Sequence, residues 1–162
     1  CVQGECSIMG YYRLAKFGDC KVLAPNLRQA DKDEVWASHG QKPLQALKIS
    51  FLLSEECNTI IGDNEDIIGM FGVTRHGKKI GIPWLLMSEE IYKPSHVKQF
   101  IPQSIEWVKK VQERYDILVN YVAQDNTKAI RWLRLLGFTF ISLEPNYGVN
   151  PKPFYEFVRI RS

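Results

Sequence analysis

The 162-residue chain lacks several features that would mark it as a membrane, secreted or disulfide-stabilised protein. It has no apolar run near the roughly 18 to 20 residues that a membrane-spanning helix needs, so we expect no membrane span. Its first residues lack a basic segment followed by an apolar one, so we expect no secretory signal peptide. Its four cysteines, Cys1, Cys6, Cys20 and Cys57, are too few and too irregularly spaced for a disulfide framework, which favours a reducing compartment such as the cytosol.

An excess of charge of one sign is also lacking. The chain carries 21 basic and 18 acidic residues, a formal charge of +3. Proteins that bind nucleic acids usually show a clustered basic face, so no specific nucleic-acid partner is expected. Cys1 and Cys6 have no histidine or second cysteine pair at a suitable spacing, and we expect no metal site.

The chain is expected to form one domain. With 45% hydrophobic residues it can bury a substantial core. No internal repeat or low-complexity linker divides it. Residues 1–8 lack an initiator methionine and a clear period, and we expect them to lie outside the fold. Met9 is then the natural start, or the chain is processed, and 9–162 form the domain.

The clearest structural unit spans 117–143. The apolar run 117–123 predicts a buried strand. Asp125, Asn126 and Thr127 follow, and their short polar side chains are typical of helix N-termini. The apolar residues that follow recur at helical spacing on one face, at Ala129, Trp132, Leu133 and Leu136. Gly137 stands where a left-handed C-terminal cap is expected, and 138–143 predicts the next strand.

Similar patterns predict the remaining elements. We expect strands over 11–17, 59–62, 67–74, 80–87 and 153–159, and helices that begin at Asp19 or cover 31–38 and 43–53. A helical face over 97–115 is interrupted by Pro102, so a helix either kinks there or begins there. The segment 144–152 either covers a site or simply connects two strands.

The unit around Asn126 carries a family resemblance. Asn126, Ala129, Gly137 and Phe138 match the spacing N-x-x-A-x-x-x-Y-x-x-x-G-F, which resembles the C-terminal half of the GCN5-related N-acetyltransferase (GNAT) fold. The family's tyrosine, often the general acid, corresponds to Leu133. The resemblance implies an α/β fold with a mixed, twisted sheet of about six or seven strands and about four helices. Strands 80–87 and 117–123 are then parallel neighbours.

A second resemblance, over roughly residues 10 to 160, is to small GNAT-like bacteriophage proteins, including internal virion proteins. The matching segments are LAPNLRQAD (23–31), LSEEC (53–57), MFGV (70–73), PWLL (83–86), NYV (120–122), IRWLRLLGF (130–138) and YGV (147–149). This resemblance implies a place in the host cytoplasm or the phage virion, with a protein partner in the particle or the host.

The GNAT resemblance also implies a binding site for acetyl-CoA between the two parallel strands, where pantetheine amides pair with unpaired backbone groups. On this hypothesis Leu85, Leu86 and Met87 offer backbone groups to the cofactor, Asn126 offers its side chain, and Arg131 contacts a phosphate. Helix capping alone is an alternative explanation for Asn126.

Two departures weaken this hypothesis. The segment 88–95 has no glycine where the family's pyrophosphate loop has several, and Glu89 and Glu90 would repel a diphosphate. Lys93, His96 and Lys98 offer partial compensation. Glu89 is the candidate catalytic base, although a solvated carboxylate in a polar turn is the simpler explanation. With Leu133 in the tyrosine's place, the acid would be Tyr121 or Tyr147.

Other candidate residues are better explained by structure. Trp132 shares the apolar helix face, and Arg131 and Arg134 lie on the other, which favours a core with a solvated face over nucleic-acid binding. Cys57 has no basic neighbour in sequence that would make it a nucleophile. Two functions remain open: an acyl-CoA-dependent N-acyltransferase acting on an unknown amine, and a non-catalytic virion or host-interaction protein with the same fold.

Overall fold

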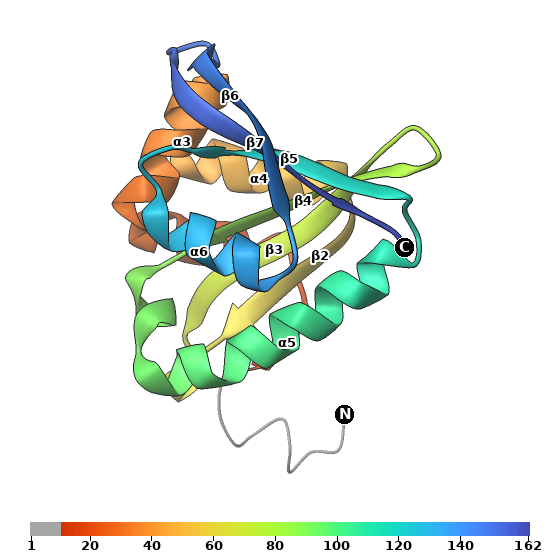
Figure 1. Cartoon of the computed structure of the whole chain (residues 1–162). Helices are drawn as coiled ribbons and strands as arrows, with labels where there is room; N and C mark the ends of the chain where they lie inside the picture. The colour runs from red at the N-terminus through yellow and green to blue at the C-terminus, as the bar shows by residue number, and fades with distance from the viewer. Residues whose placement is uncertain (1–10) are drawn as a thin grey trace.

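The computed structural model describes residues 11–162. The expected extension 1–8, with Cys1 and Cys6, lies outside the described residues. The described chain is α/β: a seven-stranded sheet in the order β1-β2-β3-β4-β5-β7-β6, with helices on both faces (Figure 1). This arrangement confirms the expected mixed sheet.

The strands are β1 (Tyr11–Leu14), β2 (Ser54–Ile61), β3 (Ile67–His76), β4 (Ile80–Met87), β5 (Ile117–Ala123), β6 (Thr139–Tyr147) and β7 (Lys152–Ile160). Neighbouring strands are antiparallel except β4 and β5, which are parallel as expected. β2 begins at Ser54 and not at Thr59, because its polar first half is held by ion pairs. There Glu55 pairs with Arg75 (2.5 Å) and Glu56 with Arg114 (2.8 Å).

The α-helices are α2 (Asp19–Leu23), α3 (Gln29–His39), α4 (Pro43–Leu53), α5 (Pro94–Gln112) and α6 (Thr127–Leu135), with 3-10 turns η1 (Ala24–Asn26), η2 (Asp63–Glu65) and η3 (Glu89–Tyr92). Pro102 lies inside α5, so this helix begins before the proline. No helix among residues 11–162 is long and apolar enough to cross a membrane.

Asp19 does not cap α2 as expected. It is the helix's first residue, and Gly18 occupies the cap position. The Asp19 carboxylate accepts hydrogen bonds from Arg13 Nη1 (2.8 Å) and Thr59 Oγ1 (2.7 Å). A buried carboxylate needs such partners, so Asp19 joins the start of α2 to β1 and β2.

The sheet separates two apolar layers. On one face, α5 and α6 cover a cluster that includes Trp107, Leu118 and Phe157. On the other face, α2 and α4 cover a cluster that includes Leu23 and Leu47. Segments far apart in sequence therefore meet on both sides of the central strands, where a site can draw on helices from either face.

The segment 144–152 contains the ends of β6 and β7 and their turn. Val149 N donates to Ser38 O (3.3 Å) and Asn150 N to Ala37 O (3.0 Å), so the turn is attached to the end of α3. Gly148 makes this contact possible: its φ is +92°, and a Cβ atom there would lie 2.2 Å from Ala37 O.

We therefore predict that Gly148→Ala strongly destabilises the protein, by roughly 3 kcal/mol or more, because left-handed strain and a backbone collision add together. Gly77→Ala is the matched control: its φ is +68°, but a Cβ atom there meets nothing within 4 Å. Only the strain of about 1 kcal/mol should remain. Urea unfolding measures both variants, and equal losses would contradict the close contact with α3.

Candidate functional site

The two parallel strands separate soon after they meet. Register pairs join Ile80 to Ile117 and Gly81 to Leu118, and none follows further along β4 and β5. Figure 1 shows the two strands diverging from this end. Beyond Gly81, each strand presents backbone N–H and C=O groups to the gap, and these groups need partners when buried.

A cavity of about 710 Å³ occupies this gap and extends to both faces of the sheet. Its volume falls in the range of small-molecule sites. On one side it is lined from α3 and α4, by residues such as Glu34 and Ile49. On the other side it is lined from α5 and α6, by residues such as Trp107 and Leu133.

Asn120 spans the gap nearest the paired end. Its Nδ2 donates to Pro83 O of β4 (2.7 Å), and its Oδ1 accepts from Tyr121 N of its own strand (2.8 Å). One side chain thus satisfies a backbone group on each strand. These are positions where a ligand that adds as an extra strand would otherwise bind.

Two carboxylates of α3 hold the far ends of the strands. Asp31 Oδ2 accepts from Met87 N at the end of β4 (2.9 Å). Glu34 Oε1 accepts from Ala123 N at the end of β5 (2.9 Å). Residues three apart lie on the same side of a helix, so α3 reaches both strands at once. We call Asp31 and Glu34 the α3 clamp.

A buried ion pair supports the β4 half of the α3 clamp. Arg28 and Asp31 are 4% and 1% exposed, and Arg28 Nη2 lies 2.6 Å from Asp31 Oδ1. Arg28 also donates to the Tyr92 hydroxyl, and its backbone N–H donates to Met87 O (2.9 Å). Buried charges require such pairing and additional hydrogen bonds.

Two of the three predicted backbone contacts, at Leu86 and Met87, involve groups that the protein itself already engages, and cofactor contact there stays a prediction. Both backbone groups of Met87 are bonded within the protein. Leu86 is paired with Met70 of β3, and because backbone groups alternate along a strand, its N–H and C=O point away from the gap. Leu85 and Met87 face the gap side, and of the two only Leu85 has no partner for its backbone there within residues 11–162.

Asn126 is the N-cap of α6, as the capping alternative proposed. Its Oδ1 accepts from Ala129 N (3.4 Å), and its Nδ2 donates to Glu34 Oε1 (2.9 Å). It is buried and lines the cavity. Contact between Asn126 and a cofactor stays a prediction, and it would have to use the second N–H of Nδ2 or the second lone pair of Oδ1.

Burial changes the ionisation of Glu34. Its pKa is raised to about 7, chiefly because burial disfavours the charged form. The hydrogen bonds from Asn126 and Ala123 oppose this effect, as they stabilise the carboxylate. Glu34 can therefore exchange a proton near neutral pH inside the cavity.

The structure does not bring Glu89 or Arg131 to the cavity. Glu89 is exposed on η3, and Arg131 is exposed on α6. Neither residue lines the cavity. A polar turn and the outer face of an amphipathic helix point to solvent, which is the simpler explanation given for each residue. Their roles in catalysis and phosphate binding stay predictions.

The turn before α5 has few free amides. Glu90 N donates to Ser88 Oγ (3.1 Å), Ile91 N to Ser88 O (3.2 Å) and Lys93 N to Glu90 O (3.2 Å). An anion site needs such amides unpaired. The turn is thus bonded to itself at the position of the family's pyrophosphate loop.

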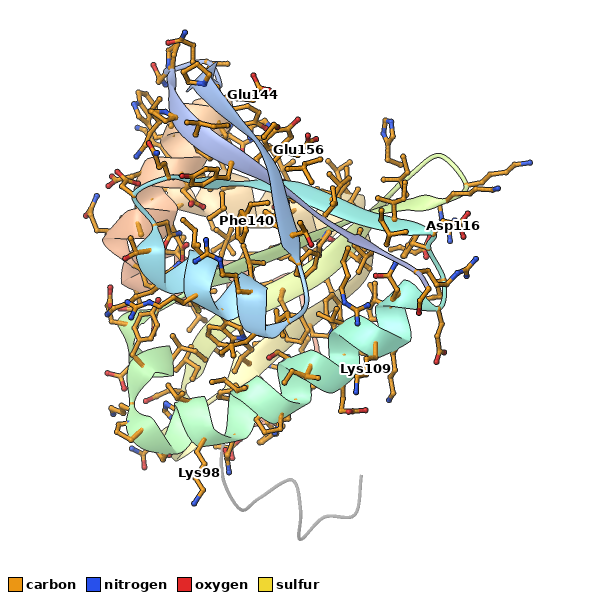
Figure 2. All side chains as sticks on the ribbon, in the orientation of Figure 1. Lys98, Lys109, Asp116, Phe140, Glu144 and Glu156 are labelled. Carbon is orange, nitrogen blue, oxygen red and sulfur yellow. The ribbon has the colours of Figure 1, made fainter. Side chains whose placement is uncertain are left out.

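The basic residues near this turn do not compensate. Lys93 Nζ pairs with Glu90 (2.6 Å), and His96 is buried, with Nδ1 2.7 Å from Glu90 O. Lys98 lies on the outer side of α5 and points away from the sheet (Figure 2). The three predicted cations therefore do not converge on one anion.

Both candidate acids line the cavity. Tyr121 and Tyr147 stack with ring centroids 4.4 Å apart, and the Tyr121 hydroxyl donates to Glu156 Oε2 (3.0 Å). Burial and this hydrogen bond raise the pKa of Tyr121 to about 12. The phenol therefore stays protonated at neutral pH.

Other residues considered from the sequence have structural surroundings that explain them. Burial raises the pKa of Cys57 to about 12, so it is a poor nucleophile. Trp132 packs inward with Nε1 bonded to Ser104 Oγ (3.1 Å), while Arg131 and Arg134 are exposed. No group of metal-ligating side chains occurs in the described part of the chain.

The residues that sequence reasoning missed are Asp31, Glu34 and Asn120. Asn120 left a signal, because it is the one strongly polar side chain in the apolar strand ILVNYVA. Asp31 and Glu34 left almost none. Their partners Met87 and Ala123 are far away in sequence, and acids three apart on a helix usually face solvent.

The fold is that of GNAT acetyltransferases. The chain resembles Ard1 from Thermoplasma volcanium, with 13% identity over 96% of this chain and 99% of that one and a TM-score of 0.70. A GCN5-related N-acetyltransferase from Kribbella flavida gives 16% identity, 94% and 98% coverage and a TM-score of 0.67. Spermidine N-acetyltransferase from Vibrio cholerae, solved with CoA and spermine, is 10% identical over 94% of this chain and 95% of that one, with a TM-score of 0.67.

Sequence comparison adds a phage connection. Residues 70–143 match the family model described as bacteriophage T7, probable scaffold protein Gp13. The match covers β4, the turn before α5, β5 and α6, which are the elements that build the gap. No curated protein sequence matches the chain.

The raised pKa of Glu34 predicts a pH effect on stability. The unfolded state loses this proton near its usual pKa of 4.5, and the folded state only near 7, so stability is lost as pH rises between these values. Glu34→Gln should remove this loss. Between pH 4 and pH 8 the free energy of unfolding of the parent should fall by roughly 2 to 4 kcal/mol more than that of the variant. Urea unfolding at both pH values tests this, with exposed Glu89→Gln as the control. Equal pH dependence in parent and Glu34→Gln would contradict the buried position.

Leu133 is partly buried, packs beside the main core and lines the cavity. Leu133→Tyr should therefore fit with a loss below about 1 kcal/mol, because the ring can extend into existing space. Leu133→Ala should cost more, roughly 2 kcal/mol, from lost apolar contacts. Thermal unfolding compares the two, and a tyrosine variant less stable than the alanine variant would show that no space is available.

Proposed function

We propose that this chain is a phage protein that uses the GNAT fold without acyl transfer, as a component of particle assembly. The observation that carries the proposal is the occupation of the gap between β4 and β5 by the protein's own side chains. Asn120, Asp31 and Glu34 satisfy backbone groups on both strands. A pantetheine chain would have to displace them.

The turn before α5 supports the same proposal. Three of its amides are bonded within the turn, and Glu90 holds Lys93 beside it. Diphosphate binding relies on unpaired amides and net positive potential. The turn offers few such amides and pairs its lysine with a glutamate, so it is poorly suited to the contact that CoA makes with a GNAT-type loop.

The link to particle assembly rests on the family model, which describes a probable scaffold protein. Such a protein acts through contacts with other proteins in a phage particle or its host cell. The GNAT fold then serves as a stable framework, and this role does not require catalytic groups in the cleft.

An acyl-CoA-dependent N-acyltransferase is the second candidate. The cavity of about 710 Å³ and the free backbone edge at Leu85 favour it. In that case acetyl-CoA would lie along Leu85 with an amine acceptor beside it, and Asn126 would contact the cofactor. Glu34, with a pKa of about 7 inside the cavity, suits the role of base better than the exposed Glu89.

Calorimetric titration with acetyl-CoA separates the two candidates. We expect no binding tighter than about 100 μM, which corresponds to roughly −5.5 kcal/mol. The spermidine N-acetyltransferase of Vibrio cholerae, titrated in the same buffer, is the positive control. Tighter binding by this chain would contradict the non-catalytic proposal and favour the acyltransferase.

A second measurement tests the assembly role directly. Antibodies raised against the chain should detect it in purified precursor particles of the phage that encodes it, at a fixed ratio to the capsid protein. A soluble host protein of similar abundance is the control for trapping. Absence from precursor and mature particles alike would contradict assembly as the function.

A further inference from the structure

The cavity has an apolar chamber on the α5–α6 side of the sheet. We use the term apolar chamber for the part lined by Phe71, Phe100, Trp107, Trp132, Leu133 and Leu136. Leu133 stands where the family's pattern has a tyrosine, so the wall facing the gap carries no hydroxyl there. The lining of the chamber is therefore mainly apolar all the way from the gap to the core.

Water is poorly held in this chamber. Ser104 Oγ already accepts from Trp132 Nε1 (3.1 Å) and donates to Ile101 O (2.8 Å). Gln103 Oε1 is the single buried cavity-lining acceptor without a partner within residues 11–162. A buried water needs about two to four polar partners, so the space suits a hydrocarbon chain better.

The opposite end of the cavity is acidic. Glu34 Oε1 accepts two hydrogen bonds, while no donor within residues 11–162 reaches its Oε2. Glu156, labelled in Figure 2, also lines the cavity and bonds only to hydroxyls, of Tyr121 (3.0 Å) and Ser142 (3.3 Å). Neither carboxylate has an ion pair with Lys or Arg in the described chain.

The cation nearest to Glu34 is already matched. Arg28 pairs with Asp31 through two hydrogen bonds (2.6 and 3.1 Å), and the two charges act on Glu34 in opposite directions: Arg28 lowers its pKa and Asp31 raises it. The remaining groups against Glu34 are the Ala123 amide and the Asn126 side chain, which are uncharged. An anionic group entering here would be repelled, and a cation attracted.

We propose that the cavity binds an amphiphilic cation, with its hydrocarbon chain in the apolar chamber and its ammonium group at Glu34 Oε2. Shape and charge then agree. The hydrocarbon chain fills the apolar chamber, which holds water poorly, and the ammonium group donates to Glu34 Oε2, which has no other donor within residues 11–162. This site goes beyond the proposed assembly function and does not depend on it.

The ionisation of Glu34 gives the proposal a pH signature. A bound ammonium group favours the carboxylate, whereas the empty site holds the proton up to a pKa of about 7. The ligand stays protonated over this range, so binding should strengthen by up to about tenfold per pH unit as pH rises from 6 to 7, and level off above it.

The test compares three probes of equal chain length: octylammonium, 1-octanol and octanoate. Trp84, Trp107 and Trp132 line the cavity, so tryptophan fluorescence reports binding, and calorimetry supplies the dissociation constants. We expect octylammonium to bind at least about tenfold more tightly than octanoate, with octanol between them. Octanoate binding as tightly as octylammonium, or no binding by any probe, would overturn the proposal.

Two variants locate the ligand. Leu133→Trp should fill the apolar chamber and abolish binding of octylammonium and octanol alike. Leu135→Trp is its control, because Leu135 lies on the same helix, is 60% exposed and does not line the cavity. Unchanged binding by Leu133→Trp would place the chain elsewhere and overturn the proposal.

Glu34→Gln tests the charged end. Octylammonium should lose about tenfold or more in affinity and lose its pH dependence, while octanol binding stays the same. If Glu34→Gln unfolds under the assay conditions, the pH profile of the parent protein provides the same test. A profile that is flat between pH 6 and 8 would remove Glu34 as the binding group.

Discussion

The separation of β4 from β5 is the constraint on which the rest of this structure depends. Two parallel strands that part after Gly81 leave backbone donors and acceptors facing a largely apolar cavity. Such groups cost about 1 to 3 kcal/mol each when buried without partners. The protein supplies partners from side chains: Asn120 within the gap, and the α3 clamp at its far end.

This solution links distant parts of the chain. α3 must be placed so that Asp31 reaches Met87 and Glu34 reaches Ala123, and the buried Arg28 holds Asp31 in that position. The turn at Gly148 is attached to the other end of the same helix. The N-terminal helices, the central strands and the last hairpin are therefore connected through α3. A change in the gap that shifts α3 would alter its contacts with all three.

The parts that sequence analysis predicted well are those whose cause is local. β4, β5 and α4 have the expected bounds, because apolar runs, prolines and caps determine them directly. The site was predicted less well. Asp31 and Glu34 differ from solvent-exposed acids only through partners far along the chain, and Glu89, which was chosen for its place after a strand, lies in a turn open to solvent. Whether the backbone groups of Leu85 or those of Leu86 face the gap depends on the direction of their hydrogen bonds, and only the strand register reveals that direction.

The likeness to GNAT acetyltransferases, at 10 to 16% identity, is a likeness of backbone. That backbone requires the strands to separate, but it does not specify what fills the separation. In an enzyme a cofactor can complete the strand edges, and the protein then keeps those edges free. Here Asn120 and the α3 clamp complete four of them, and the space that remains is lined by Trp132, Leu133 and their apolar neighbours. The same fold thus offers an apolar chamber with an acidic end, and the chemistry of the cavity follows from its side chains and not from the sheet around it.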